Sequence, residues 1–574
     1  MRHLLPYLKK FRLEVIMAPL FKLLESCFDL AVPLIVAKII DVGIYSHDRR
    51  YVLTRFAFMI GMAVLGLLCT FVAQFFAARA AVGTAAGLRH ELLDRIQHFG
   101  FSELDRFGAS TLITRMTSDV NQVQNGTNLF LRLFLRSPFI VFGSMLLAFT
   151  INARIALVFV GVIAVLFVIV FGIMRITSPM YRRVQQRLDG VTDQTREGLN
   201  GVRVIRAFGR EKRQHAQFVE ADGALFDAQL RVGRVSALLN PLTYVVINSG
   251  VLLVLWLGAN KVNGGVLLTG SVIALINYIG QILVELVKLA NLIIQLSKSV
   301  SCMGRIGQVL DTESSMAFAD GGSAAATDEA VRFDHVGLHY DDAGAESLSD
   351  VSFCVRRGET VGIIGGTGSG KSSLVQLIAR FYDATSGTVV LNGAPIQGYS
   401  RQTLLSTVAI VDQKPRLFSG TIRSNLLWGK PDATDDELWH ALTQAQAADF
   451  VRAKPRGLDE PVEQGGANFS GGQKQRLTVA RTLLTGAPIL ILDDSASALD
   501  YATEAALRRA LKELPAEATV FLVSQRASSM LHADRILVLD DGRLVGNGTH
   551  EALLRSCEVY REIYESQFKT EAEA

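Results

Sequence analysis

A glycine-rich stretch at residues 365–372 carries the clearest chemistry, because it fits the pattern G-x-x-x-x-G-K-[ST]. Glycines let successive backbone N–H groups turn inward around an anion, and the Lys371 ammonium can reach the β- and γ-phosphates of a nucleotide. The Ser372 hydroxyl is of the type that holds Mg²⁺. The residues of this expected phosphate site are Gly365, Gly366, Thr367, Gly368, Ser369, Gly370, Lys371, Ser372 and Ser373.

Two flanking segments must position this loop. Residues 361–364 are apolar and predict a short strand, and residues 373–380 predict a helix whose N-terminus faces the phosphates. A second apolar run, residues 489–493, predicts a buried strand that delivers the Asp493 carboxylate to Mg²⁺. From residue 331 to 574 the alternation of strands and helices predicts an α/β nucleotide-binding domain.

A Ser-Gly-Gly-Gln turn opens a further predicted helix at residues 473–484. Its residues are Ser470, Gly471, Gly472 and Gln473. A helix N-terminus of this kind attracts anions. One nucleotide does not need two such helix ends, so we expect the second one to act across a dimer.

The apolar mass of the chain lies in its first half. Hydrophobic residues make up 49% of the 574 residues and charged residues only 20%, which suggests that part of the chain lies in a bilayer. We therefore expect an α-helical polytopic membrane domain over residues 1–310 and a flexible linker over 311–330. The six apolar segments that predict six transmembrane helices are 15–43, 53–80, 128–151, 155–178, 236–260 and 267–296. Polar, helix-prone stretches lie at 85–125 and 180–232.

An even number of spans places both termini on one side of the membrane. The basic N-terminus and the Arg-rich loops favour the cytoplasmic side, although Arg49, Arg50 and Arg55 lie in an outer connection. We expect a multi-pass protein of the plasma or inner membrane, in contact with lipid. The net charge of +4 is small and no basic-aromatic patch is present, so nucleic acid is not an expected partner. The five cysteines are scattered and predict neither a metal site nor a disulfide framework.

The phosphate loop, the Ser470–Gln473 turn and their order resemble those of ATP-binding cassette (ABC) transporters, and the first half resembles the six-helix membrane domain of an ABC exporter. The resemblance implies ATP and Mg²⁺ as cofactors and an ATPase activity coupled to transport. It implies that Tyr340 stacks on adenine and that Gln413 contacts Mg²⁺ together with Ser372 and Asp493. It also implies that Ser470–Gln473 complete the ATP site of a partner half-transporter.

Four further regions share in this resemblance. Residues 107–119 and 201–208 resemble the two coupling regions of the membrane domain. Residues 463–466 resemble the loop before the signature, which contacts the partner's cytoplasmic helices. Residues 497–500 resemble the loop through which two ATP sites communicate.

Two positions depart from the family pattern. Members that hydrolyse ATP well carry a glutamate after the Mg²⁺-binding aspartate, where this chain has Asp494, and a histidine where it has Gln525. A shorter carboxylate and an uncharged amide both weaken hydrolysis at the site that also contains Lys371. We therefore expect the degenerate-site half of a heterodimeric exporter; neutral change in a slow enzyme is the alternative.

Polar residues inside the predicted spans are costly and often line a cavity. The residues of a candidate substrate cavity are Glu25, Asp29, Asn277, Gln281 and Glu285. A structural pairing, such as Glu285 with Lys288, is the alternative. Arg132 and Arg136 are expected in water near the outer end of the third span.

These features favour a transport function. The leading prediction is ATP-driven export of hydrophobic or amphipathic small molecules. A lipid flippase or a siderophore importer would use the same scaffold. A soluble regulatory ABC ATPase belongs to another class, and the six apolar segments oppose it.

Overall fold

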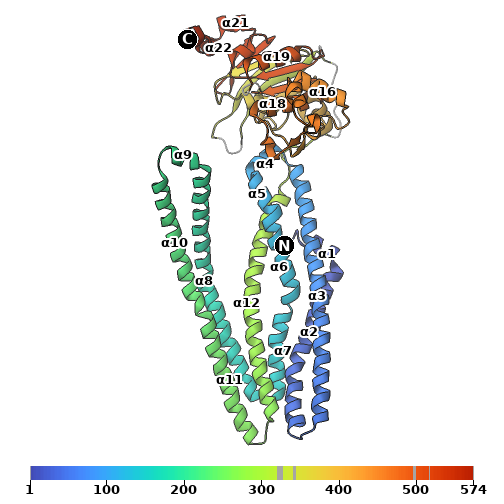
Figure 1. The fold of residues 1–574 in the computed structure, drawn as a ribbon, viewed down its shortest axis with the longest axis vertical. Coiled ribbons are helices and arrows are strands. Elements are labelled where there is room, and N and C mark those ends of the chain that lie inside the picture. The colour runs from blue at the N-terminus through green and yellow to red at the C-terminus, as the bar shows by residue number, and fades with distance from the viewer. Residues whose placement is uncertain (1, 320–326, 341–343, 496–498, 516, 573–574) are drawn as a thin grey trace. The chain divides into compact units, whose positions relative to one another are not determined.

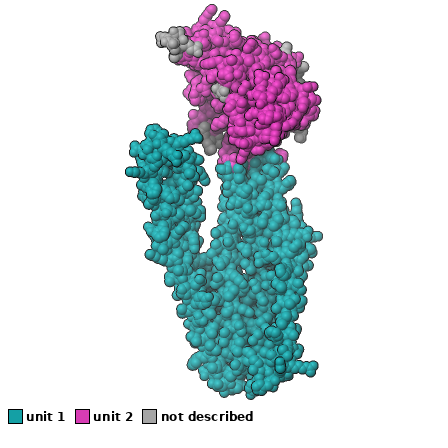
Figure 2. Space-filling model, viewed as in Figure 1, with its two compact units in different colours: residues 1–97, 110–312 teal, residues 98–109, 313–574 magenta. Residues whose placement is uncertain are grey.

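The structure is a computed structural model that describes residues 2–319, 327–340, 344–495, 499–515 and 517–572. It divides into two compact units (Figure 2). Unit 1 comprises residues 1–97 and 110–312, and unit 2 comprises residues 98–109 and 313–574. Part of the predicted linker, residues 320–326, lies outside the described residues. Because residues 98–109 belong to unit 2, that unit includes a short segment from the first half of the chain.

Unit 1 is helical (Figure 1). Its main helices are α1 (Leu5–Lys10), α2 (Arg12–Lys38), α3 (Arg49–Gln97), α5 (Ala109–Thr114), α6 (Val120–Leu133), α7 (Arg136–Ile151), α8 (Ala153–Asn200), α9 (Val202–Ala207), α10 (Glu211–Ala237), α11 (Leu239–Asn263) and α12 (Thr269–Asp311). Short π-helical turns follow α2 at Ile39–Ile44 and precede α6 at Arg115–Asp119. The chain breaks between α6 and α7 because Pro138, in the first turn of α7, cannot continue a preceding helix.

Five helical segments are long and apolar enough to cross a membrane within the part of the chain that the structure describes. They are Arg49–Gln97, Ala109–Ile151, Ala153–Asn200, Glu211–Asn263 and Thr269–Asp311. Helix α2 is not among them, because Lys22, Glu25 and Asp29 interrupt its apolar sequence. The helical membrane domain is confirmed, whereas the count of six spans stays a prediction. The predicted polar stretches are largely helical and extend several of these segments beyond their apolar parts.

The side chains of unit 1 divide into a packed interior and an apolar exterior. Leu30, Phe159 and Tyr278 are buried in one core between α2, α7, α8, α11 and α12. Large apolar side chains such as Val168 and Trp256 are exposed at 68% and 64%. An apolar exterior of this extent suits contact with lipid rather than water.

Unit 2 contains a parallel sheet that is extended by one antiparallel strand. The strand order is β12-β11-β3-β10-β9-β6, and only β12 pairs in the antiparallel sense. The strands are β3 (Thr360–Gly365), β6 (Val408–Val411), β9 (Ile489–Asp493), β10 (Thr519–Val523), β11 (Arg535–Asp540) and β12 (Arg543–Gly548). Strand β9 is buried along its whole length, as a strand covered on both faces should be.

A second, antiparallel sheet with the order β2-β1-β4-β5 packs in the same core. Its strands are β1 (Glu329–Leu338), β2 (Leu348–Arg356), β4 (Ser386–Leu391) and β5 (Ala394–Pro395), and β7 (Gly420–Thr421) pairs separately with β8 (Pro461–Val462). The helices of unit 2 are α4 (Phe101–Phe107), α13 (Lys371–Ile378), α14 (Arg401–Thr407), α15 (Ile422–Leu426), α16 (Asp435–Gln444), α17 (Ala448–Arg452), α18 (Gly471–Leu483), α19 (Tyr501–Lys512), α20 (Ala527–Met530), α21 (His550–Ser556) and α22 (Glu558–Ala572). The predicted α/β fold is confirmed.

Candidate functional site

The phosphate loop joins β3 to α13, so the predicted strand, loop and helix are confirmed. Gly370 has a φ of 93°, and a Cβ there would lie 2.7 Å from the carbonyl oxygen of Ser347, so the position requires glycine. The Lys371 ammonium donates to the carbonyl oxygens of Gly365 at 3.0 Å and Gly366 at 2.5 Å. These bonds hold the cation against its own loop, where a nucleotide phosphate would replace the carbonyl oxygens.

Burial sets the electrostatics of this loop. It lowers the pKa of Lys371, and the negative charges of Asp494 and Asp493 oppose that shift. Burial also raises the pKa of Asp493, and a hydrogen bond from Ser372 opposes that shift. Each group is therefore short of compensating charge, which the phosphates and Mg²⁺ of a nucleotide complex would supply.

The Ser372 hydroxyl and the Asp493 carboxylate form a pair of oxygen donors suited to Mg²⁺. Ser372 Oγ donates to Asp493 Oδ1 at 3.3 Å. Neighbouring ligands on an octahedral Mg²⁺ ion are about 3 Å apart, so the spacing of the two oxygens fits that ion. Gln413 follows β6 and is exposed, and its Nε2 lies 3.4 Å from Asp494 Oδ2. The structure thus brings Gln413 next to the residue that follows Asp493.

Asp494 has a fixed backbone. Its φ is 45°, in the left-handed region, and its N–H donates to the carbonyl oxygen of Val523 at 3.0 Å. The Asp494 Cα is thereby tied to β10, and the carboxylate can extend from it only by the length of an aspartate.

Gln525 lies two residues beyond Val523, which is the neighbour of Asp493 in the sheet. Its side chain is exposed, and its carbonyl oxygen accepts from Gln567 Nε2 at 2.8 Å. The neighbouring N–H of Ala527 donates to Gln567 Oε1 at 2.8 Å. Helix α22 therefore holds the backbone on which Gln525 sits, at the end of the sheet that also carries Asp493.

Tyr340 lies beside the helix of the phosphate loop. Its hydroxyl donates to Gln376 Oε1 and accepts from Ser373 Oγ, at 3.1 Å in each case. Its ring meets that of Tyr382 edge to face, with 5.0 Å between the centroids. Burial raises the pKa of Tyr340, so the ring stays neutral. The predicted adenine-stacking residue is thus adjacent to the predicted phosphate site.

The Ser-Gly-Gly-Gln turn forms a capping box at the start of α18. Ser470 Oγ accepts from the Gln473 N–H at 3.3 Å, and the Ser470 N–H donates to Gln473 Oε1 at 3.1 Å. Ser470 and Gly471 are exposed, which leaves this helix end accessible. In the loop predicted to link two ATP sites, 497 and 498 lie outside the described residues, and Asp500 caps α19 by accepting from the Thr503 N–H at 2.8 Å.

Four of the five predicted cavity residues cluster in unit 1 around Arg136. The Arg136 guanidinium lies 2.9 Å from Asp29, 3.7 Å from Glu25 and 3.6 Å from Glu285. Gln281 Nε2 donates to the backbone carbonyl of Asp29 at 3.3 Å. The cluster joins α2, α7 and α12.

Two lysines complete this cluster. Lys22 lies 2.5 Å from Glu25, and Lys288 lies 2.9 Å from Glu285, as the pairing alternative predicts. The Ser137 hydroxyl donates to Glu285 at 2.8 Å. Asn277 instead bonds the carbonyl oxygen of Ile273 on its own helix at 3.0 Å and is exposed. Three carboxylates therefore face three cations.

The prediction that Arg136 lies in water is wrong. Its side chain is only 14% exposed, because it packs against three carboxylates on α2 and α12. Arg132, one turn earlier on α6, is intermediate in exposure. No signal in the sequence points to Arg136, because its partners lie more than 100 positions away along the chain.

Helix α4 packs within unit 2, and most of its contact residues were not predicted from the sequence. The Phe101 ring stacks on Phe381 with 4.2 Å between the centroids. The Tyr382 hydroxyl donates to the Asp105 carboxylate. Glu103 Oε1 accepts from the Ser315 N–H at 3.1 Å. The predicted first coupling region begins at residue 107, where this helix ends.

Comparison with known proteins agrees with both halves of this architecture. The family described as the ABC transporter transmembrane region matches residues 15–286, and the family described as ABC transporter matches residues 348–497. The "Uncharacterized ABC transporter ATP-binding protein YfiB" of Bacillus subtilis is 35% identical over 571 residues, which are 100% of this chain and 99% of that protein.

Two further matches bear on the type of transporter. The "Putative multidrug export ATP-binding/permease protein YgaD" of Bacillus subtilis is 31% identical and covers 99% of this chain and 98% of its own length. A solved structure of a bacterial Atm1-family ABC exporter with ATP bound has a TM-score of 0.80 and 25% identity. The similarity covers 97% of this chain and 98% of that one.

The fold and the site define a multi-pass membrane protein that binds ATP and couples its hydrolysis to transport. The chain belongs to the ABC transporter family and has the exporter arrangement, in which the transmembrane region is fused to the ATP-binding cassette. Exporters of this kind function as dimers, so a second half-transporter is required.

Proposed function

We propose that this chain is one half of a heterodimeric exporter of hydrophobic or amphipathic small molecules, and that its own ATP site hydrolyses poorly. Six spans would place both termini in the cytoplasm. Lys371 and the phosphate loop would bind ATP, Tyr340 would stack on adenine, and Ser470–Gln473 would complete the partner's site. The name of the relative YgaD, which refers to multidrug export, supports this class of substrate.

The fixed position of Asp494 is the observation on which this proposal depends. A general base must reach its water at about 2.6–3.2 Å, and aspartate is one methylene shorter than the glutamate of efficient family members. Because the Asp494 N–H is bonded to Val523 and its φ is already 45°, the backbone cannot advance to make up the lost length without breaking that bond. The Asp494 carboxylate therefore stays too far from the attacking water to act as an efficient general base.

Gln525 weakens the same step in a different way. The histidine of efficient members can carry a positive charge toward the γ-phosphate, whereas an amide cannot. The backbone carbonyl of Gln525 accepts from Gln567 of α22 at 2.8 Å, so the Cα from which the Gln525 side chain extends has a defined position. Two independent losses at one site favour a site that keeps ATP bound over one that turns it over.

The test compares the chain alone, the chain with a candidate partner half-transporter, and two variants. We expect slow ATP hydrolysis by the chain alone, little change in Asp494→Ala, and a gain of about tenfold or more in Asp494→Glu/Gln525→His, because a positioned general base contributes about 10²–10⁴-fold. Addition of the correct partner should raise hydrolysis without these substitutions. Rapid hydrolysis by the unaltered chain alone, abolished by Asp494→Ala, would refute the proposal.

A further inference from the structure

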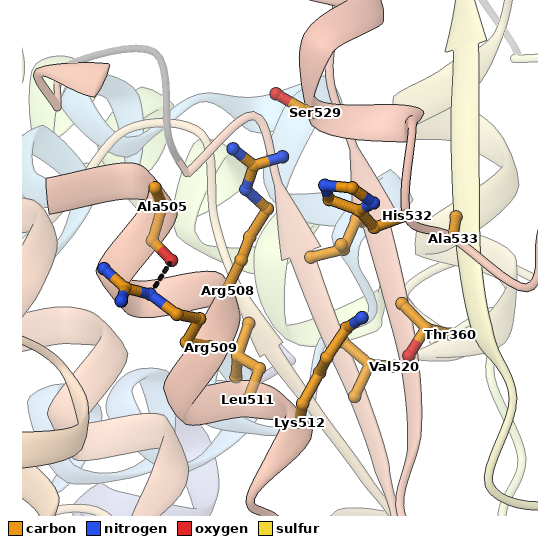
Figure 3. Close-up of a pocket in the computed structure, with 11 residues that line it drawn as sticks. Thr360, Ala505, Arg508, Arg509, Leu511, Lys512, Val520, Ser529, His532 and Ala533 are labelled. Atoms are coloured by element: carbon orange, nitrogen blue, oxygen red, sulfur yellow. Dashed lines mark hydrogen bonds between the residues drawn. The ribbon is translucent and has the colours of Figure 1, made fainter. Parts of the chain in front are cut away.

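A cavity of about 310 Å³ lies in unit 2, outside the candidate ATP site (Figure 3). Helix α19 and strand β10 supply much of its lining, and the rest comes from Thr360 at the start of β3, from α20 and from the segment after α20. Part of the lining is apolar, including Leu511 and Val520, and part is cationic or polar, including Arg508, Lys512, His532 and Ser529. A volume of this size is at the lower end of the range for small-molecule sites.

The cations of this cavity are not neutralised by carboxylates in its wall. None of the lining residues, all of which the structure describes, is an aspartate or a glutamate. The side chains of Arg508 and Lys512 rise from α19 toward the side on which His532 lies (Figure 3). Arg509 differs, because its Nε donates to the carbonyl oxygen of Ala505 on its own helix at 3.4 Å.

Two carboxylates next to the wall are already engaged. Asp534 accepts from the Thr360 N–H at 2.8 Å. Glu504 is 2% exposed and accepts from Ser529 Oγ at 2.5 Å and from Arg526 Nη1 at 3.1 Å. Arg508 Nη1 donates to the carbonyl oxygen of Ser528 at 2.9 Å, but its buried Nε has no hydrogen-bond partner among the described residues. A buried donor without an acceptor is costly, so the Arg508 guanidinium is not fully satisfied by the chain's own acceptors.

We propose that this cavity binds a small phosphate monoester with an apolar body. Arg508, Lys512 and His532 hold the phosphate, because guanidinium and ammonium groups form charge-assisted hydrogen bonds to its oxygens. Leu511 and Val520 cover the apolar body. Burial of that body adds a hydrophobic contribution to the binding free energy that inorganic phosphate cannot make.

Hydrogen bonds link the cavity wall to the segment that carries Gln525. Ser529 lines the cavity, and its Oγ lies 3.5 Å from Ser524 Oγ. Ser524 Oγ also accepts from the Arg526 N–H at 3.0 Å, so these bonds bracket Gln525. A ligand that shifts Ser529 would shift the segment that carries Gln525, and binding at the two sites would then be thermodynamically coupled.

The experiment uses the full chain in detergent micelles, with the ATP site saturated by a non-hydrolysable ATP analogue and Mg²⁺. Calorimetric titration with phenyl phosphate measures binding, and inorganic phosphate and phenol are the comparison ligands. We expect phenyl phosphate to bind most tightly. Lys512→Glu should weaken it about tenfold or more, because attraction to the Lys512 ammonium becomes repulsion.

Arg555→Glu is the matched control, since Arg555 on α21 is exposed, as Lys512 is, but does not line the cavity. It should leave phenyl phosphate affinity within about twofold. Equal affinities in the two variants would overturn the site, and equal binding of inorganic phosphate would overturn the apolar part. Phenyl phosphate should also change the affinity for the ATP analogue about fivefold in the unaltered chain but not in Lys512→Glu. The same affinity with and without it would overturn the coupling.

Discussion

Substitution of Arg136 by methionine tests the charge cluster of unit 1. The guanidinium is 14% exposed and lies within 4 Å of Asp29, Glu25 and Glu285, at 2.9, 3.7 and 3.6 Å. Methionine keeps most of the side-chain length and apolar stem, so the change removes the charge and the hydrogen bonds while limiting the loss of packing.

The expected cost follows from the charges that remain. Without Arg136, three carboxylates face only the ammonium groups of Lys22 and Lys288, which leaves one negative charge in excess. Removal of one partner from a buried ion pair costs about 3–5 kcal/mol. Asp29 is 44% exposed, so water screens part of the excess, and we expect a loss near the lower end, about 3 kcal/mol. Arg136→Met/Asp29→Asn restores neutrality and should lose only about 1 kcal/mol.

The assay is the free energy of unfolding in mixed micelles titrated with sodium dodecyl sulfate. Arg132→Met is the matched control, because within the described residues Arg132 has no carboxylate within the 4 Å of an ion pair, and it should change stability by less than about 0.5 kcal/mol. Equal losses in Arg136→Met and Arg132→Met would refute the reasoning. So would a double variant that is less stable than Arg136→Met.

Three further predictions concern unit 2. Burial raises the pKa of Tyr560 from 10.0 to about 12, so stability is complete below pH 10 and falls as the pH rises to 12, by up to about 1.4 kcal/mol per unit. Tyr560→Phe loses the 2.8 Å bond to His550 but should show a shallower decline over that range in alkaline thermal melts. Gly370→Ala forces a residue with a Cβ into the left-handed conformation of the phosphate loop, at a cost of about 1–2 kcal/mol. ATP affinity, measured by fluorescence titration, should therefore fall about tenfold. Unchanged affinity would show that the loop has another conformation. Removal of Mg²⁺ by EDTA should weaken ATP binding in the unaltered chain more than in Asp493→Asn, and an equal effect in both would exclude Asp493 as a ligand.

The nucleotide-binding unit could be predicted from the sequence to a large extent, because its signals are local. The motif around Lys371 specifies a strand, a tight turn and a helix within about 20 residues. The run that ends in Asp493 contains only buried residues in the structure, and its apolar composition predicts that burial. Ser470 begins its helix because a serine at this position caps the backbone N–H of Gln473.

Features that depend on distant partners could not be predicted in this way. Arg136 has a sequence context that fits either an exposed helix end or a buried pair, and only the packing of α2 and α12 decides between them. Arg508 and His532 likewise reach one cavity from segments with no shared motif. The predicted span at residues 15–43 depends on a local signal instead. The charged residues of α2 lower the hydropathy of that segment, so composition alone does not identify it as a span.

The contribution of α4 to unit 2 affects how that unit can be studied by itself. A fragment that starts at residue 313 would lack the ring that covers Phe381 and the acceptor that binds the Tyr382 hydroxyl. It would also lack Glu103, which binds the backbone at Ser315. Such a truncated protein would expose the apolar rings of Phe381 and Tyr382 close to Tyr340. Low solubility or weak nucleotide affinity of the fragment would then result from the truncation and not from a property of the full-length transporter.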